Sequence, residues 1–293
     1  MSSRLSGSSG FDVGPTLLFC PADRPERYAK AAERADAVII DLEDAVAADD
    51  KPAARQHLHG HLEALAAPEA EALRRRTVVR VNPAGTEAFD ADVEHLAGAG
   101  AALVMLAKAE SVDDVAAAAA AFPAAGIIAL CETAAGVSRA EQIASHPQVV
   151  ALMWGAEDLI ASIGGSSSRR PDGLYRDVAR QARTQVLLAA ATHGAAGIDA
   201  IYADIDDAEG LAAEAADAVG SGWAAKACIH PAQVPVVRQA YAPSAEDLEH
   251  ARALLDEVPR HGGAFRFRGA MVDMPLVRHA EQIVRRAEAA GDA

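Results

Sequence analysis

The sequence is poor in cysteine and in strongly apolar runs, and both scarcities exclude classes of protein. Its three cysteines are odd in number and lie inside apolar segments, which is typical of reduced core thiols in an intracellular protein. The longest apolar stretch, 116–131, is mostly alanine and is interrupted by Pro123 and Gly126, so it is too weakly apolar to span a bilayer. The Ser/Gly-rich start of the chain has no apolar segment of the secretory type. We therefore expect a cytoplasmic protein without a membrane partner.

Basic residues are also scarce. The chain has 27 Lys and Arg against 42 Asp and Glu, a formal net charge of −15 at pH 7. A surface of that sign is a poor match for nucleic acid or for an anionic membrane. Only four of the basic residues are lysines, Lys30, Lys51, Lys108 and Lys226. With so few, the position of each lysine is informative.

Alanine is abundant instead, and it separates short runs of β-type residues. There are 72 alanines among 293 residues, and because alanine is the best helix former, many must lie on helix surfaces. Apolar runs without strict alternation are typical of strands buried on both faces. Eight such runs are present: 16–20, 37–41, 77–82, 101–107, 126–131, 149–155, 200–203 and 224–229.

Eight β/α repeats favour an α/β fold of the TIM (β/α)₈ barrel type, for which about 250 residues is typical. A doubly wound sheet is the alternative, although it usually needs fewer strands. We expect a flexible tail over 1–14, the barrel over 15–235 and a C-terminal helical extension over 236–293. In the extension we expect a helix from Ser244 to about Val258, a loop, and a last helix from Pro275.

Several helix starts can be read from the sequence. Pro52 follows two aspartates, as a proline in the first helical turn often follows an acidic cap. Ser111 and Asp114 have the spacing of a capping box, and so do Ser138 and Glu141. Each pair therefore predicts the first turn of a helix.

Charged side chains stand at the ends of most predicted strands. In a barrel all eight carboxyl ends meet on one face, where polar residues are typical of a catalytic site. Any one of them could instead be a helix cap or part of a solvated turn, but the same pattern at most of the ends favours a site. The residues at or just beyond these ends are Asp41, Glu43, Asp44, Arg80, Asn82, Lys108, Glu132, Glu157, Asp158, Asp204, Asp206, Lys226 and His230.

This set is rich in carboxylates and has no His/Cys cluster, which suits a hard cation held by oxygen. Mg²⁺ commonly takes one or two carboxylates and fills its other positions with water and substrate. Glu132 and Asp158 terminate adjacent strands and could share one ion. Glu43 and Asp44 could orient its water ligands. The bidentate fork of Arg80 suits a substrate carboxylate or a developing enolate oxygen.

Six segments together resemble the citrate lyase β-subunit-like branch of the HpcH/HpaI aldolase family. That branch also contains malyl-CoA, β-methylmalyl-CoA and citramalyl-CoA lyases. The resemblance runs from about Thr16 to Ala280. The segments are LFCPADRPERYAKAAERADAVIIDLEDAV, RVNPAGT, CETAAGV, WGAEDL, AKACIHPAQV and GAMVDMPLV.

The resemblance implies a barrel that cleaves or forms a carbon–carbon bond next to a thioester carbonyl, with one Mg²⁺ per subunit. It implies a homotrimer or hexamer in which Asp273, a catalytic acid, comes from a neighbouring subunit. The loop PADRPE departs from the family pattern, in which a glycine more often follows the proline. The implied roles are metal binding for Glu132 and Asp158, catalysis for Arg80, Glu43 and Asp44, substrate binding for Arg80, Glu132, Gly155, Ala156 and Glu157, and contact with CoA phosphates for Arg24, Arg27 and Lys30.

The remaining polar residues leave alternatives open. Lys108 and Lys226 could form a Schiff base, as in class I aldolases, or pair with carboxylates at the barrel mouth. The histidines at 57, 59 and 61 could bind a metal or form a solvated helix face. His230 could be structural or catalytic, and Arg169 and Arg170 could touch CoA phosphates or be exposed.

Four functions follow from these residues. The first is a lyase acting on a β-hydroxyacyl-CoA thioester such as citramalyl-CoA, malyl-CoA or citryl-CoA, which yields an acyl-CoA and an α-keto acid. The second is a citryl-ACP lyase subunit of a citrate lyase complex. The third is a non-catalytic barrel partner, and the fourth is a class II aldolase of free acids. The set Arg80, Glu132, Asp158 and Asp273 argues against the non-catalytic partner, and a loop for CoA argues against the free-acid aldolase.

Overall fold

The computed structural model describes residues 11–289 and 291, which form two compact units. The first unit extends to Val237 and the second begins at Arg238. Of the tail expected over 1–14, residues 1–10 lie outside the described part of the chain.

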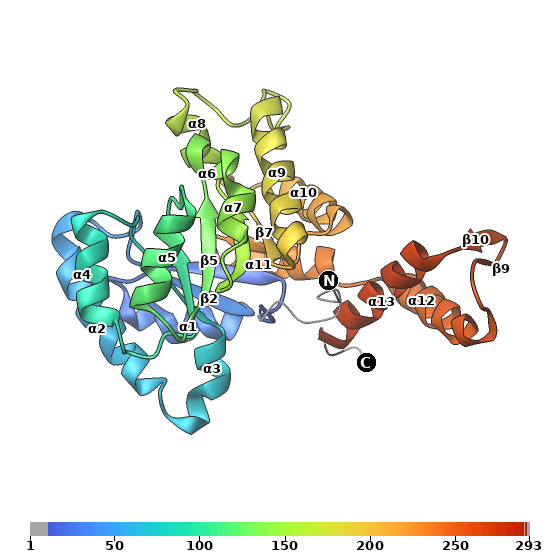
Figure 1. The fold of residues 1–293 in the computed structure, drawn as a ribbon, viewed down its shortest axis with the longest axis horizontal. Coiled ribbons are helices and arrows are strands. Elements are labelled where there is room, and N and C mark those ends of the chain that lie inside the picture. The colour runs from blue at the N-terminus through green and yellow to red at the C-terminus, as the bar shows by residue number, and fades with distance from the viewer. Residues whose placement is uncertain (1–10, 290, 292–293) are drawn as a thin grey trace. The chain divides into compact units, whose positions relative to one another are not determined.

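The first unit is a closed barrel of eight parallel strands, in the order of the sequence (Figure 1). Each strand pairs with its sequence neighbours, and β1 pairs with β8 to close the barrel. The TIM barrel prediction is therefore confirmed, and the doubly wound alternative is wrong. The strands are β1 (Thr16–Pro21), β2 (Ala37–Asp41), β3 (Thr77–Val81), β4 (Leu103–Leu106), β5 (Gly126–Cys131), β6 (Val149–Trp154), β7 (Ala196–Asp199) and β8 (Ala225–Cys228).

Helices connect the strands and surround them, and alanines fill both their faces. In α5, Ala118 and Ala119 are buried while Ala116 and Ala117 are exposed. None of the helices in the described residues is both long and apolar enough to cross a membrane. The helices of this unit are α1 (Tyr28–Arg34), α2 (Lys51–Ala64), α3 (Glu71–Arg75), α4 (Glu87–Leu96), α5 (Val112–Ala121), α6 (Ala134–Ser138), α7 (Ala140–Ala144), α8 (Ala156–Ser162), α9 (Asp177–His193), α10 (Ala208–Ser221) and α11 (Gln233–Tyr241), which continues past Val237.

One of the two expected capping boxes forms. Ser111 accepts a hydrogen bond from the N–H of Asp114 and the Asp114 carboxylate accepts one from the N–H of Ser111, which begins α5 as predicted. The prediction for Ser138 is wrong, because Ser138 is the last residue of α6. Its hydroxyl donates back to the carbonyl of Ala134 at 2.7 Å, and the N-cap of the next helix is Arg139, which makes no side-chain cap hydrogen bond.

The seventh strand lies earlier than expected. We predicted it over 200–203, but β7 is Ala196–Asp199. Its pairing with β8 places Asp199 beside Lys226, so a completely buried ion pair closes this part of the barrel. Because Asp199 interrupts the apolar run of β7, the hydrophobic pattern indicated the apolar run that follows it as the strand.

The interior of the barrel is a packed core and not a pore. One cluster of buried residues takes side chains from all eight strands, including Leu17, Ile39, Met105, Leu130 and Ile198. Branched and unbranched aliphatic residues fill this space, as is usual in TIM barrels. Because the centre is filled, a ligand can be held only at an end of the barrel, where the strand termini meet.

The second unit is a pair of helices with a hairpin between them. Helix α12 (Ala245–Glu257) starts at the Ser244 cap, as expected, and is followed by β9 (Phe265–Phe267), β10 (Ala270–Val272) and α13 (Met274–Ala289). We expected only a loop between the helices. A two-residue turn of Arg268 and Gly269, both with positive φ, closes the antiparallel hairpin.

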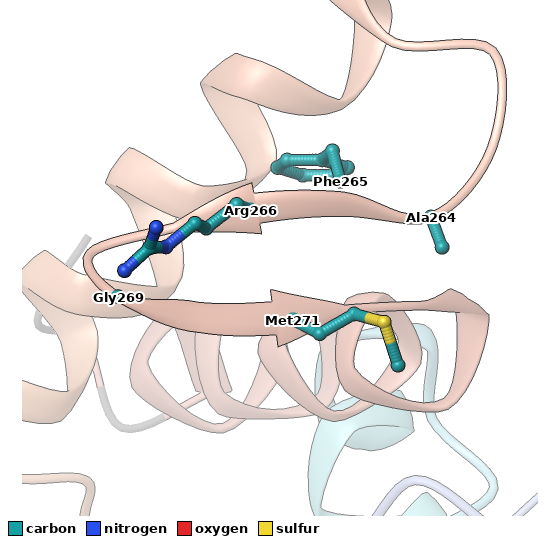
Figure 2. Close-up of a pocket in the computed structure, with 5 residues that line it drawn as sticks. All are labelled: Ala264, Phe265, Arg266, Gly269 and Met271. Atoms are coloured by element: carbon teal, nitrogen blue, oxygen red, sulfur yellow. The ribbon is translucent and has the colours of Figure 1, made fainter.

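The two helices of this unit pack through a small apolar cluster that includes Ala251, Leu254, Val277 and Ala280. The hairpin carries a shallow pocket, and Figure 2 shows the side chains that line it, among them Phe265, Arg266 and Met271.

Candidate active site

The carboxyl ends of β2 to β6 bring four of the predicted site residues, together with Lys108, into one charged cluster. Its members are linked by ion pairs and hydrogen bonds that cross from strand to strand. Lys108, after β4, contacts residues that follow β2, β5 and β6. The members are Glu43, Arg80, Lys108, Glu132 and Asp158. This grouping agrees with the rule that functional side chains in a barrel come from the ends of several strands.

Arg80 is held rigidly on β3. Its guanidinium makes two hydrogen bonds of 2.6 Å to the carboxylate of Asp41, and a third nitrogen lies 3.1 Å from Glu43 Oε2. The ring of Phe19 covers it at 4.9 Å. Asp41 is itself fixed by the backbone N–H groups of Glu43 and Ala45. The arginine is therefore oriented before any ligand binds.

Asp41 is a residue that we did not assign to the site from the sequence. It lies directly across from Arg80 in the pairing of β2 with β3, and opposite charges at such positions attract. That cross-strand register was the signal that could have identified it, but the register is known only once the strands are paired.

Glu132 is the most deeply buried acid of the cluster. In the described residues no Lys or Arg side chain lies within hydrogen-bond distance of its carboxylate. It follows β5 and is 3% exposed, and the N–H of Lys108 donates to its Oε1 at 3.2 Å. Burial raises its pKa to about 8, and the nearby Asp158 carboxylate adds to the shift. Ionising Glu132 is therefore costly unless a positive charge is supplied beside it.

This pair of acids fits a magnesium ion. Two carboxylates that repel each other, one of them buried, form a site whose charge a divalent cation would offset. Oε2 of Glu43 is also buried and accepts no well-directed hydrogen bond. In the described residues no three His, Cys, Asp or Glu side chains are grouped tightly enough to hold a metal alone. Mg²⁺ needs only one or two carboxylates, because water and substrate complete its coordination.

Gly155 leaves just enough room for the Glu132 carboxylate. A Cβ added at Gly155 would lie 2.7 Å from Glu132 Oε2 and 2.8 Å from Glu132 Cβ. Gly155 caps α8, whose first turn carries Ala156, Glu157 and Asp158. The close approach of the two segments therefore requires glycine.

We predict that Gly155→Ala disables the site without unfolding the barrel. The added methyl group must displace the Glu132 carboxylate, and a shift near 1 Å at a catalytic group costs about 10²-fold in rate. The measurement is Mg²⁺-dependent turnover together with the unfolding temperature. Gly60→Ala is the matched control, because a Cβ there meets nothing within 4 Å. Equal activity of the two variants would contradict the assignment of Gly155.

Lys108 connects Glu43 of the cluster to Asp44, the next residue in the chain. The Lys108 ammonium binds Glu43 Oε1 and lies 3.2 Å from Asp44 Oδ2 and 3.7 Å from Asp158 Oδ1. Burial opposes its charge, but the contact with Glu43 raises the pKa of Lys108 above its ordinary value. Burial also raises the pKa of Glu43, against the opposing effect of Arg80.

Lys226 is completely buried on the outer side of the barrel, because its strand neighbours Ala225 and Ala227 face the interior. Its ammonium binds Asp199 at 3.1 Å, Glu214 at 2.9 Å and the carbonyl of Ala200 at 2.7 Å. Both lysines therefore pair with carboxylates, but only those of Lys108 lie at the barrel mouth as expected, since Lys226 is paired between the barrel and α10. A Schiff base needs a neutral, accessible amine, but Lys226 is completely buried and the raised pKa of Lys108 favours its charged form.

We predict that Lys226→Met destabilises the protein by about 1.5–3 kcal/mol, because it removes two charge-assisted hydrogen bonds and leaves Asp199 with Arg183 alone and Glu214 with Arg169 alone. The measurement is the free energy of unfolding in urea. The matched control is Arg75→Met, which removes an exposed pair with Glu71 and should cost at most about 1 kcal/mol. A similar small loss for Lys226→Met would contradict the structural role.

The proposed CoA-binding residues lie beyond β1, on the same end of the barrel. Arg24 precedes a short 3₁₀ turn, Pro25–Arg27, and Arg27 is its last residue. Lys30 lies in α1. All three are exposed, and the two arginines make only loose local pairs, 3.5 Å with Asp23 and 3.8 Å with Glu26. Their charges are therefore accessible to an anion from solution.

Several other polar residues have structural partners. Asp204 and Asp206 form a local turn after β7 and do not end a strand, so their predicted position is wrong. His59 bonds to the carbonyl of His95, and His230 accepts from the N–H of Ala232. Arg169 pairs with Glu214, and Arg170 pairs with Asp177. Glu157 accepts a hydrogen bond from the hydroxyl of Ser168. Asn82 is hydrogen-bonded to Asp92 and Lys51.

Asp273 belongs to the second unit. It lies between β10 and α13, is exposed, and its carbonyl accepts the N–H of Val277 in the first turn of that helix. Its carboxylate is thus accessible to a group outside its own unit.

Comparison with known proteins places these features in a family. The profile of the HpcH/HpaI aldolase/citrate lyase family matches residues 15–231. A citrate lyase subunit beta-like protein of Mycobacterium tuberculosis is 52% identical over 275 residues, which cover 94% of this chain and 96% of that protein. A (3S)-malyl-CoA thioesterase of Cereibacter sphaeroides is 35% identical over 279 residues, 94% of each chain.

A solved structure is similar over the same length. The crystal structure of CitE from Mycobacterium tuberculosis in complex with magnesium, acetoacetate and coenzyme A superposes with a TM-score of 0.83 at 51% identity. The match covers 94% of this chain and 98% of that one. With the barrel, its acidic mouth and these similarities in agreement, the chain belongs to the HpcH/HpaI aldolase/citrate lyase family.

Proposed function

We propose that the protein is a Mg²⁺-dependent carbon–carbon lyase acting on a β-hydroxyacyl-CoA thioester such as citramalyl-CoA, malyl-CoA or citryl-CoA. Cleavage would yield an acyl-CoA and an α-keto acid, and the reverse reaction would join them. The observation that carries the proposal is the pair Glu132 and Asp158 beside a fixed Arg80. The related CitE structure with magnesium, acetoacetate and coenzyme A supports it.

Each residue has a role in this chemistry. Glu132 and Asp158 would hold the metal, which when bound would act as a Lewis acid on the oxygens of the keto-acid half. Arg80 would stabilise the negative charge that collects on the thioester enolate oxygen as the carbon–carbon bond breaks. Glu43 and Asp44 would orient water molecules near the metal. The backbone and side chains of Gly155, Ala156 and Glu157 would line the substrate site beside Glu132.

The thioester would need two further contributions. Arg24, Arg27 and Lys30 would bind the phosphates of CoA, as their exposed charges on the strand-end face allow. Asp273 of a neighbouring subunit would exchange a proton with the α-carbon of the acyl group as general acid and base. We therefore propose a homotrimer or hexamer in which each site is completed by a second chain.

A thioesterase is the second candidate, and its support is the Cereibacter sphaeroides relative. Hydrolysis would release free CoA and the intact hydroxy acid, whereas lyase cleavage leaves the acyl group on CoA. A citryl-ACP lyase subunit is the third, and its support is the relative named for the citrate lyase beta subunit. In that case the thioester would be carried by a protein and the enzyme would need partner subunits.

The experiment that separates these functions is a product assay on a panel of thioesters. Citramalyl-CoA, malyl-CoA, β-methylmalyl-CoA, citryl-CoA and a citryl thioester of a carrier protein are each incubated with the protein, with and without Mg²⁺. Acyl-CoA and keto acid identify the lyase, while free CoA and hydroxy acid identify the thioesterase. Turnover of the carrier-protein thioester alone identifies the complex subunit. If no member of the panel is turned over with Mg²⁺, the CoA lyase proposal is wrong.

A further inference from the structure

Lys108 has an unusual backbone conformation. Its φ is +47°, and the other non-glycine residue with positive φ in the described part of the chain is Arg268, in the hairpin turn. The left-handed region is unfavourable for a residue with a Cβ, and such strain tends to persist at functional sites. At Lys108 this conformation directs the backbone N–H to Glu132 Oε1, 3.2 Å away, while the side chain extends toward the carboxylates of the neighbouring strands.

The side chain of Lys108 joins acids from two sides of the site. Its ammonium contacts Glu43 and Asp44, which follow β2, and approaches Asp158, which follows β6, to 3.7 Å. Arg80, the other cation of the cluster, pairs with Asp41 and Glu43, whereas Asp44 and Asp158 contact Lys108. Lys108 is therefore the cation that balances Asp44 and Asp158, and it shares Glu43 with Arg80.

This balance matters because the proposed ligands of the site have opposite charges. A divalent cation is attracted by the carboxylates, but an α-keto acid is an anion and is repelled by them. A fixed ammonium among the carboxylates lowers the repulsion of the anion and, by the same field, lowers the attraction of the cation.

We propose that Lys108 is the charge-balancing residue of the site, a fixed internal cation that makes an acidic metal site able to accept an anionic α-keto acid. This inference rests on the proposed function and adds to it a residue with a stated electrostatic role. The role predicts effects of opposite sign on the two ligands. A residue needed only for the architecture of the site would, when removed, weaken the binding of both.

The test is Lys108→Met, which keeps a long apolar chain and removes the charge. Binding of Mg²⁺ alone, and of pyruvate at saturating Mg²⁺, is measured by titration calorimetry on the full-length protein. We expect Mg²⁺ to bind about tenfold more tightly and pyruvate about tenfold more weakly than in the wild type. Lys108→Arg is the matched control and should bind both ligands within about threefold of the wild type.

Lys108→Gly is a second variant, because glycine adopts positive φ readily and should fold even where Met does not. It should shift both affinities in the same directions as Lys108→Met. Weaker binding of both ligands, or no change in either, overturns the role of Lys108. If the wild-type protein itself binds neither Mg²⁺ nor pyruvate, the proposed function fails and not only this inference.

Discussion

Replacement of Asp273 by asparagine is expected to lower kcat by about 10²- to 10⁴-fold, the usual contribution of a general acid or base. Asparagine has nearly the same size but exchanges no proton, so the exposed turn between β10 and α13 should keep its structure. Binding of Mg²⁺ should be unchanged, because the proposed ligands Glu132 and Asp158 belong to the first unit. The measurements are turnover of the active thioester and titration with Mg²⁺.

Complementation between two inactive variants tests whether Asp273 acts in a neighbouring subunit. Asp273→Asn and Glu132→Gln chains are co-expressed, so that one chain supplies Glu132 and the other Asp273. If sites form between subunits, about a quarter of them should be intact after random mixing, and activity should return. Asp256→Asn, an exposed acid of the same unit, is the control and should keep full activity. Full activity of Asp273→Asn would show that its assigned role is wrong.

Replacement of Glu132 by glutamine is expected to weaken Mg²⁺ binding at least about 100-fold and to remove measurable turnover. The amide keeps the shape of the side chain, but it carries no charge and binds a hard cation poorly. Removal of Mg²⁺ from the wild-type protein with EDTA should have the same effect on turnover. Titration with Mg²⁺ and the thioester assay measure the two losses.

The free energy of unfolding of Glu132→Gln should depend on pH differently from that of the wild type, and the direction of the difference can be predicted. The pKa of Glu132 is raised to about 8 in the folded protein, so without metal the folded state holds its proton more tightly than the unfolded state. Stability is then lost as pH rises from the ordinary range of a glutamate toward 8. Glutamine cannot lose that proton, so Glu132→Gln should be the more stable protein near pH 8 and similar to the wild type near pH 4.

The matched control for Glu132→Gln is Glu141→Gln, an exposed glutamate on α7. It should retain Mg²⁺ binding and turnover, and it should show no such divergence of stability with pH. Mg²⁺ binding by Glu132→Gln at the wild-type affinity would remove Glu132 from the proposed metal site.

The barrel could be predicted because its signals are local. The apolar runs at 37–41 and 126–131 coincide with β2 and β5, since strands covered on both faces need apolar side chains throughout. The predicted position of the seventh strand was wrong because β7 contains the charged residue Asp199. That charge is tolerated because Lys226 and Arg183 form ion pairs with it in the folded chain. The hydrophobic pattern also did not indicate the hairpin of the second unit, whose three-residue strands are mostly exposed.

The site residues could be predicted because the carboxyl ends of the parallel strands all lie on one face of the barrel. That rule brought Glu43, Arg80, Glu132 and Asp158 together without knowledge of any contact. It could not supply Asp41 as the partner of Arg80, 39 positions away, or distinguish a Schiff-base lysine from an ion-paired one. Those distinctions depend on strand register and on burial.

The sequence by itself determined the β/α alternation, the acidic character of the strand ends and the family of the chain, because these depend on residue type and order. The tertiary structure decided which charges meet. Closure of the barrel fixes the register of β2 against β3, and that register pairs Asp41 with Arg80. It also buries Lys226 among acids. At Lys108 it directs the backbone N–H to Glu132 and the side chain to Glu43. Such pairings arise between residues far apart in the chain, where only the folded geometry sets distance and exposure to solvent.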